Sequence, residues 1–376
     1  MNTNINPTAK SVMRACLQKI ATGPELSKNL SEEESRQAMS MVLDGSADEV
    51  QAAIFLIALR MKRETNAELR GALRALLDSS VRVTADVNEV LNLADPFDGY
   101  IRSLPAAPFL PAVLSSCGIA TVSQGAESMG PKFGATHRKI LEAANVKVEL
   151  DARAAAKQVA DRRIGWAYID QRCFCPPLHS VRELRTRIVK RSCLTTLEVL
   201  LGPIWGQRNT HLLTGYVHKP YPPIYSMLAR VSGYTSAMIV RGIEGGVTAS
   251  LSQPSKLIRF FGDGKDEEMR LDPAEAGIRS ETRGVPLPQG LELESLGGSE
   301  PDSLKASVNV DAVVTAAATA GLEALGGNSG PMRDSLLYSA AQCLLCLNRA
   351  GSLREGVEIA ARGLDSGSAL RRFEAS

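Results

Sequence analysis

Glycines, cations and a histidine gather in one short segment, Gly130–Lys139, which reads GPKFGATHRK. Its two glycines permit a close approach of the backbone to a ligand, and its two lysines and one arginine suit an anion. The segment therefore predicts contacts with a phosphate group. A basic helix start at the protein surface would show the same pattern and is the alternative interpretation.

A second reactive pair, His218 and Lys219, follows the apolar run Leu212–Val217. Histidine can act as an acid or a base near neutral pH, and a lysine here could anchor a phosphate or a carboxylate. The equal alternative is a solvated loop in which the histidine bonds to a nearby tyrosine.

Basic residues are concentrated in residues 157–191, which hold nine lysines and arginines against three acids. Five of these cations fall in Arg182–Arg191. At 100° per residue they spread over about two-thirds of a helix circumference, which favours a solvated basic face over a groove-reading helix. Contacts with a nucleic-acid backbone would tolerate such a spread, so a nucleic-acid surface stays open as an alternative.

The composition is that of an ordinary globular protein. The 376 residues are 44% hydrophobic and 22% charged, with a formal net charge of +2. The longest apolar run, Ala52–Leu59, is far shorter than the roughly 20 residues of a membrane helix. Seven cysteines and an N-terminus without an apolar signal core predict a cytoplasmic protein with reduced thiols and no membrane association.

The first eighty residues predict capped amphipathic helices. Ser31 with Glu34 and Thr65 with Glu68 have the spacing of capping boxes, and Asp48 can cap a third helix between them. On that third helix, Val50, Ile54, Ile57 and Met61 share one apolar face. These signals predict a small helical bundle.

From about residue 88, short apolar runs alternate with helical segments, which predicts an α/β fold with a mainly parallel sheet covered by helices. Ligands of such sheets sit beyond the carboxyl ends of the strands. The expected strands are Ile119–Val122, Val146–Leu150, Trp166–Ile169, Leu212–Val217 and Ala237–Val240.

Two long stretches carry a resemblance to a known family. Leu30–Leu76, with its capped helices, and Gly330–Phe373, which contains GPMRDSLLYSAAQCLLCLNRAG, resemble the helical domain and the closing helices of the anthranilate phosphoribosyltransferase family. The resemblance implies a helical domain at 1–80, joined by helices from about 176–192. It also implies a phosphoribosyltransferase-like α/β domain at 81–376 with an irregular insertion near 263–305.

The family transfers a ribose phosphate from phosphoribosyl pyrophosphate to an aromatic amine. Its glycine-rich loop aligns with Ala94–Gly99, where only Asp98 and Gly99 match. Its second phosphate loop aligns with Ser123–Glu127, where only Gly125 matches. Both departures predict an altered way of holding the donor.

The remaining family positions also differ in this sequence. Val247 and Thr248 stand where the resemblance places the carboxylates that hold magnesium, so Mg²⁺ keeps only Glu244 as a candidate ligand and the metal stays unassigned. The acceptor-binding arginine of the family falls near Thr195. The resemblance further implies a homodimer formed through exposed apolar faces at Ala38–Leu43 and Ile54–Met61.

The predicted site combines these positions. His218 and Glu244 are the candidate catalytic residues. The candidate phosphate or donor residues are Asp98, Gly99, Gln124, Gly125, Ser128 and Lys132. The candidate acceptor or anion residues are Arg172, Lys190, Arg191, Lys219 and Arg241.

The sequence thus predicts a divergent phosphoribosyltransferase-family protein. We expect a pentosyltransferase that binds a phosphate-bearing small molecule and acts on an acceptor other than anthranilate. The alternative is a non-catalytic paralogue that binds nucleic acid or nucleotide through a basic face.

Overall fold

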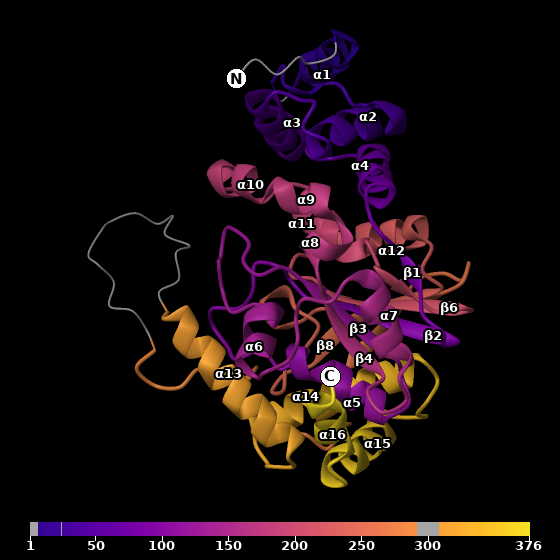
Figure 1. The fold of residues 1–376 in the computed structure, drawn as a ribbon, viewed down its shortest axis with the longest axis vertical. Helices are drawn as coiled ribbons and strands as arrows, with labels where there is room; N and C mark the ends of the chain where they lie inside the picture. Colours follow the sequence, from indigo (N-terminus) through magenta and orange to yellow (C-terminus); the bar gives the residue numbers. More distant parts are fainter. Residues whose placement is uncertain (1–6, 24, 292–307) are drawn as a thin grey trace.

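The computed structural model describes residues 7–23, 25–291 and 308–376, and the N-terminal helices form one end of the molecule (Figure 1). Four helices, α1 (Pro7–Ile20), α2 (Glu32–Leu43), α3 (Glu49–Lys62) and α4 (Asn66–Asp78), make this helical bundle. Both predicted capping boxes are present. The side chains of Ser31 and Thr65 each accept a hydrogen bond from the backbone N–H of the glutamate three residues on, and that glutamate's carboxylate accepts one from the backbone N–H of the cap residue. Asp48 caps α3 as predicted.

Later segments join the bundle. The short helix α9 (Pro176–Ser180) contacts α2, and α10 (Arg182–Ile188) contacts α3. These are the segments that the sequence places near 176–192. In Figure 1 they lie between the bundle and the sheet.

A seven-stranded sheet forms the second part of the fold. Its order is β4-β3-β2-β6-β7-β8-β9, with parallel pairing from β4 through β7 and antiparallel pairing at β8 and β9. The strands are β2 (Glu89–Ala94), β3 (Thr121–Gly125), β4 (Trp166–Asp170), β6 (Asn209–Gly215), β7 (Ser236–Val240), β8 (Ser255–Phe261) and β9 (Glu267–Leu271). A separate two-stranded sheet pairs β1 (Val83–Thr84) with β5 (Ile204–Trp205). The mainly parallel α/β fold is confirmed.

Successive apolar residues of the central strands belong to two different cores. On β2, Val90 packs with the bundle side of the sheet, together with α7 (Ala152–Ala160) and α12 (Tyr221–Ser232). The next residue, Leu91, packs with α5 (Leu110–Ser116) and the C-terminal helices. This period of two is the expected pattern of a sheet covered on both faces.

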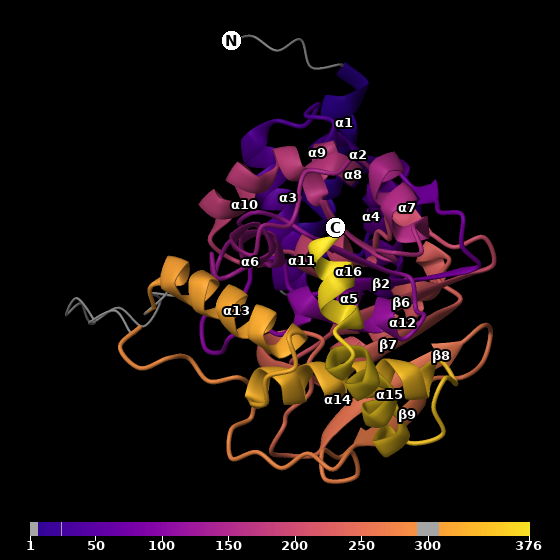
Figure 2. The same ribbon diagram turned by 60° about the horizontal axis from the view of Figure 1, so that its bottom comes forward.

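The C-terminal helices cover the face of the sheet that points away from the bundle (Figures 1 and 2). They are α13 (Val310–Leu325), α14 (Pro331–Cys346), α15 (Leu353–Asp365) and α16 (Ser368–Glu374). The remaining short helices are α6 (His137–Ala143), α8 (Gln171–Phe174), α11 (Leu194–Leu197) and the 3₁₀ turns η1 (Ala107–Phe109), η2 (Glu198–Leu200) and η3 (Ile243–Gly245).

Two sequence predictions are wrong. Val146–Leu150 is not a strand, although Val146, Val148 and Leu150 are buried alternately as in a strand, because the segment pairs with no strand of the described chain. Ala38–Leu43 is not an exposed face, since Ala38 and Met39 are fully buried against the other bundle helices. The predicted insertion near 263–305 includes β9, and its residues 292–305 lie outside the described residues.

Candidate active site

A cleft of about 1020 Å³ opens at the carboxyl ends of the central parallel strands. Pro96 and Asp98 reach it after β2, His218 after β6, and Arg241 and Glu244 after β7. This is where a doubly covered parallel sheet is expected to bind its ligand.

Cations dominate the charged lining of the cleft. Its carboxylates are Asp98 and Glu244. Its lysine and arginine side chains are Arg60, Arg102, Lys132, Arg191, Arg241 and Arg283. Since the whole chain carries a formal charge of only +2, this excess is local to the cleft and suits an anionic ligand.

The cleft is built by both parts of the fold. Arg60 comes from α3 of the bundle, and Arg191 follows α10. Arg241 follows β7 of the sheet, and Arg283 lies in the chain beyond β9. A ligand that fills the cleft therefore meets charges from both parts.

Lys132 lies between the two carboxylates of the cleft. Its Nζ is 3.5 Å from Asp98 Oδ1 and 3.6 Å from Glu244 Oε2, and it stands 5.7 Å from the centre of the Tyr100 ring. Arg191 holds the other oxygen of Asp98, with 2.5 Å between its Nη2 and Asp98 Oδ2. These contacts join the loop after β2 to the segment Gly130–Lys139.

Glu244 anchors the loop after β2. Its Oε1 accepts hydrogen bonds from the Arg102 N–H at 2.9 Å and the Ser103 hydroxyl at 3.1 Å, and its Oε2 accepts from the Ile101 N–H at 3.2 Å. Its backbone has a φ of +51°, a conformation that L side chains rarely adopt. A glutamate held in this way positions neighbouring backbone.

A buried network around Asp95 supports the same loops from below. Asp95 Oδ2 accepts from the Tyr100 hydroxyl and from His137 Nε2–H, both at 2.8 Å, and Asp95 Oδ1 accepts from the Val247 N–H at 2.8 Å. The Ser123 hydroxyl lies 2.7 Å from His137 Nδ1. Burial, and then the charge of Asp95, raise the pKa of Tyr100 well above its ordinary value, so this hydroxyl stays a donor.

Asp95 is not among the candidate site residues predicted from the sequence. Its signal was available, because it precedes the matching Asp98–Gly99 pair and directly follows a strand. What the sequence does not reveal is that its hydrogen-bond partners come from α6 and from the loop after β7.

An aromatic wall borders the cleft next to His218. The ring centre of Tyr221 is 6.3 Å from that of His218 and 6.1 Å from that of Tyr225. Burial raises the pKa of Tyr225 and of Tyr216, which also lines the cleft, so both phenols stay protonated. The three rings are tilted by about 40° from one to the next and give the cleft an aromatic side.

The structure brings six of the predicted residues together in the cleft, namely Asp98, Lys132, Arg191, His218, Arg241 and Glu244. The other predicted residues lie outside the described lining, and these are Gly99, Gln124, Gly125, Ser128, Arg172, Lys190 and Lys219.

Three of the outlying residues have other contacts. Buried Gln124 donates to the backbone oxygen of Val199, at 3.0 Å. Gly125 faces the Tyr168 ring, and a Cβ there would lie 3.3 Å from its hydroxyl oxygen. Arg172 forms an ion pair with Glu149, and its Nε lies 3.8 Å from Asp170 Oδ1.

The residues present do not fit a magnesium ion held by protein carboxylates. Val247 and Thr248 are buried, and neither side chain has a carboxylate. Asp98 and Glu244 face each other across the ammonium of Lys132. The described residues contain no group of three or more His, Cys, Asp or Glu side chains arranged to hold a metal ion.

The basic stretch at 157–191 is largely engaged with carboxylates. Arg185 is buried and holds Glu198 with two hydrogen bonds, at 2.6 and 2.9 Å. Arg187 pairs with Glu49, and Arg163 Nη2 lies 2.9 Å from Asp161 Oδ2. These pairs reduce the charge that the stretch offers to a polyanion. Nucleic-acid binding through it stays a prediction.

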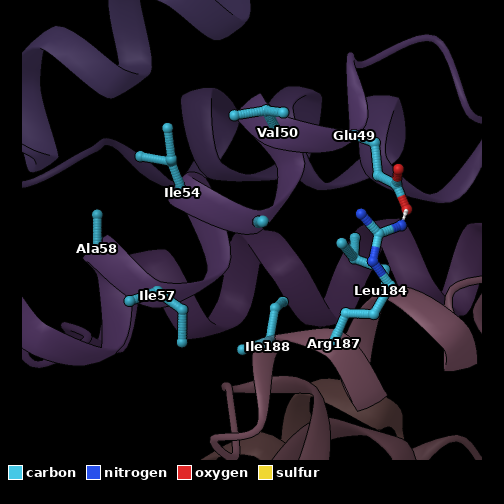
Figure 3. A pocket seen from close by; sticks show the side chains of 9 residues that line it. Glu49, Val50, Ile54, Ile57, Ala58, Leu184, Arg187 and Ile188 are labelled. Carbon is cyan, nitrogen blue, oxygen red and sulfur yellow. Dashed lines mark hydrogen bonds and ion pairs between the residues drawn. The ribbon is translucent and has the colours of Figure 1, made fainter.

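An apolar groove of about 500 Å³ lies between α3 and α10 (Figure 3). Ile54, Ile57 and Ala58 reach it from α3, and Leu184 and Ile188 from α10. Val50 is 65% and Met61 77% exposed, so the face predicted around Ile54–Met61 is open to solvent. The homodimer through this face stays a prediction.

Comparison with known proteins assigns the chain to a family. Residues 14–80 match the helical bundle domain of a glycosyl transferase family, and residues 106–370 match the a/b domain of the same family. The chain belongs to this glycosyl transferase family. Together with the relatives below, these matches place it among the anthranilate phosphoribosyltransferase-like members.

Its curated relatives include the anthranilate phosphoribosyltransferases of Symbiobacterium thermophilum and Petrotoga mobilis. The first is 27% identical over 366 residues, with 96% of each chain covered. The second is 24% identical over 360 residues, covering 95% of this chain and 94% of the relative.

Solved structures share the fold over almost the whole length of both chains. Anthranilate phosphoribosyltransferase from Thermus thermophilus has a TM-score of 0.68 at 20% identity, with 98% of each chain covered. The enzyme from Saccharomyces cerevisiae in complex with PRPP and Mg has a TM-score of 0.73 at 17% identity, covering 97% of this chain and 96% of that one. None of the described helices of the present chain has the length and apolar character needed to cross a bilayer.

Proposed function

We propose that this protein binds a phosphate-bearing pentosyl donor in the cleft and transfers the pentosyl group to an acceptor other than anthranilate. The cationic lining carries the proposal, because it lies where the shared fold is expected to bind its ligand. Family membership over both domains supports pentosyl transfer as the class of reaction.

Four cleft arginines support the binding of more than one anionic group. Within the described chain, no carboxylate forms an ion pair with Arg60, Arg102, Arg241 or Arg283. Each is exposed at the cleft rather than engaged in holding the fold. Charge-assisted hydrogen bonds from such guanidinium groups are well suited to phosphate oxygens.

In this proposal the residues divide the work by position. The four unpaired arginines attract the phosphates, Lys132 and Arg191 neutralise the two carboxylates of the cleft, and Glu244 keeps the loop Ile101–Ser103 in place. As the bond between the ribose carbon and pyrophosphate breaks, the acceptor nitrogen forms its bond to that carbon. His218 then takes the proton that the acceptor loses.

The acceptor side differs from that expected for anthranilate. Thr195 lines the cleft where the resemblance places a cationic acceptor residue, so a carboxylate has no arginine at that position. The wall of His218, Tyr221 and Tyr225 offers stacking surface instead. We therefore expect an aromatic acceptor that is recognised mainly by its ring.

The test is release of pyrophosphate from phosphoribosyl pyrophosphate with a panel of aromatic amines and heterocyclic nitrogen bases, anthranilate included. We expect release with at least one member of the panel and none above background with anthranilate. His218→Gln should lower the rate, whereas Lys157→Met, on the exposed side of α7, should not.

Absence of turnover with every acceptor, together with absence of donor binding by calorimetry, would overturn the proposal. Turnover with anthranilate would overturn its acceptor part alone.

A further inference from the structure

We infer that Lys132 occupies the place of a divalent cation in this cleft, so that the protein binds diphosphate groups without magnesium. This inference rests on the proposed function, since it concerns how the same cleft holds a phosphate-bearing donor. It follows from the placement of one buried ammonium group and from the commitments of the two carboxylates beside it.

The ammonium of Lys132 is shared by the two acids of the cleft. Its distances to Asp98 Oδ1 and Glu244 Oε2, 3.5 and 3.6 Å, are nearly equal. The side chains of Asp98 and Glu244 are 3% and 9% exposed, and that of Lys132 is 9% exposed. A cation between two buried carboxylates is the charge arrangement that a bound metal would otherwise create.

The carboxylate oxygens already have partners among the described residues. Both oxygens of Glu244 accept from the loop Ile101–Ser103, and Asp98 Oδ2 is held by Arg191. Magnesium demands near-ideal octahedral oxygen coordination and sheds its water reluctantly. To bind between Asp98 and Glu244 it would have to displace the ammonium of Lys132.

The position of Lys132 is fixed by its backbone as well as by its charge. The Gly134 N–H donates to the Asp98 carbonyl at 2.9 Å, and Tyr100 and Ala135 exchange two backbone hydrogen bonds, at 2.9 and 3.0 Å. The two loops therefore form one unit. Gly134 is required for this close approach, because a Cβ there would lie 2.5 Å from the Tyr100 carbonyl oxygen.

The positive charge that remains for a ligand comes from arginine. Lys132 and Arg191 balance Asp98 and Glu244, which leaves Arg60, Arg102, Arg241 and Arg283 to face the ligand. Four unpaired guanidinium groups exceed the charge of one Mg²⁺. A diphosphate can thus be neutralised by side chains alone.

The experiment measures binding of phosphoribosyl pyrophosphate and of inorganic pyrophosphate by calorimetry, in excess EDTA and in excess Mg²⁺. For the unchanged protein we expect dissociation constants in EDTA that equal those in Mg²⁺ to within about twofold, or tighter ones. Lys132→Met should weaken binding in EDTA by about tenfold or more, since two carboxylates then face the ligand unbalanced. Lys132→Arg, which keeps the positive charge, should bind more tightly in EDTA than Lys132→Met does, and Lys157→Met is the matched control.

Binding at least about tenfold tighter in Mg²⁺ than in EDTA would overturn the inference and leave the proposed function standing. Absence of binding in both conditions would overturn the inference and, together with absence of turnover with every acceptor, the proposed function as well. If Lys132→Met fails to fold, as judged by near-ultraviolet circular dichroism, the comparison of the two conditions with the unchanged protein still decides.

Discussion

The cleft and the basic stretch at 157–191 are both rich in cations, but they use them differently. In the stretch, buried Arg185 forms an ion pair with Glu198. At the surface, Arg187 pairs with Glu49 and Arg163 with Asp161. In the cleft, Arg241 and Arg283 have no ion pair within the described chain. The stretch also holds Lys157 and Arg162, which are exposed and have no ion pair among the described residues, so the cleft differs in that its unpaired arginines line one cavity.

The largest expected effect is a loss of stability when the ion pair between Arg185 and Glu198 is broken. Arg185→Met leaves the buried carboxylate of Glu198 without its cation, which should lower the free energy of unfolding by about 3–5 kcal/mol. Denaturant unfolding measures the loss. Arg162→Met, an exposed arginine of the same stretch, should change it by less than about 0.5 kcal/mol. Equal, small losses in both variants would remove the structural role assigned to Arg185.

The next effect concerns the unpaired arginines. Arg241→Ala and Arg283→Ala should each cost about 1.5–3 kcal/mol of pyrophosphate binding, the usual worth of a hydrogen bond to a charged group. Their unfolding free energies should stay unchanged. Calorimetric titration and denaturation on the same samples check both statements. Unchanged affinity in both variants would show that these arginines are ordinary surface charges.

The groove between α3 and α10 extends the comparison, because Arg187 of the basic stretch lies on its edge in a pair with Glu49 (Figure 3). If the apolar floor is the homodimer face, Ile54→Glu with Met61→Glu should convert a dimer to a monomer, since a buried unpaired charge is costly. Sedimentation velocity reads the result. A control double variant with Leu26→Glu and Val81→Glu, also exposed apolar residues, should remain dimeric. A monomeric parent protein would contradict the prediction.

The smallest effect is a pH dependence inside the basic stretch. Burial lowers the pKa of His179, and the charges of Arg182 and Arg172 lower it further against the opposing charge of Asp170. The unfolded chain therefore binds a proton more readily than the folded one, so stability should fall as the pH drops below the ordinary histidine value of about 6.5. Denaturation midpoints between pH 7 and pH 5 should show a shallower decline in His179→Gln. Identical pH profiles would show that His179 contributes nothing.

The sequence predicts local structure well wherever a signal acts within a few residues. The capping boxes at Ser31 and Thr65 and four of the five expected strands follow from short-range patterns, and the structure confirms them, whereas the central strand β2 was not among the expected strands. Val146–Leu150 fails because alternation of burial does not reveal whether a neighbouring strand exists. Pairing between strands is a long-range property.

The candidate site was harder to predict, for the same physical reason. Asp98, Lys132 and Glu244 could be selected individually, but their shared ion pair depends on how three separate loops meet. Arg60 was not selected, since it looks like the ordinary basic end of a helix. Arg185 and Arg191 are near neighbours in sequence, yet one stabilises the fold and the other faces the cleft.

The position of Arg60 bears on the distance between the helical bundle and the sheet. It belongs to the helical bundle, while Arg241 and Arg283 belong to the sheet and its extension. An anion that neutralises both sets pulls the two halves toward one another and favours the arrangement in which they are closest. Saturating pyrophosphate should therefore reduce the radius of gyration of the protein in solution, and Arg60→Ala should abolish that reduction.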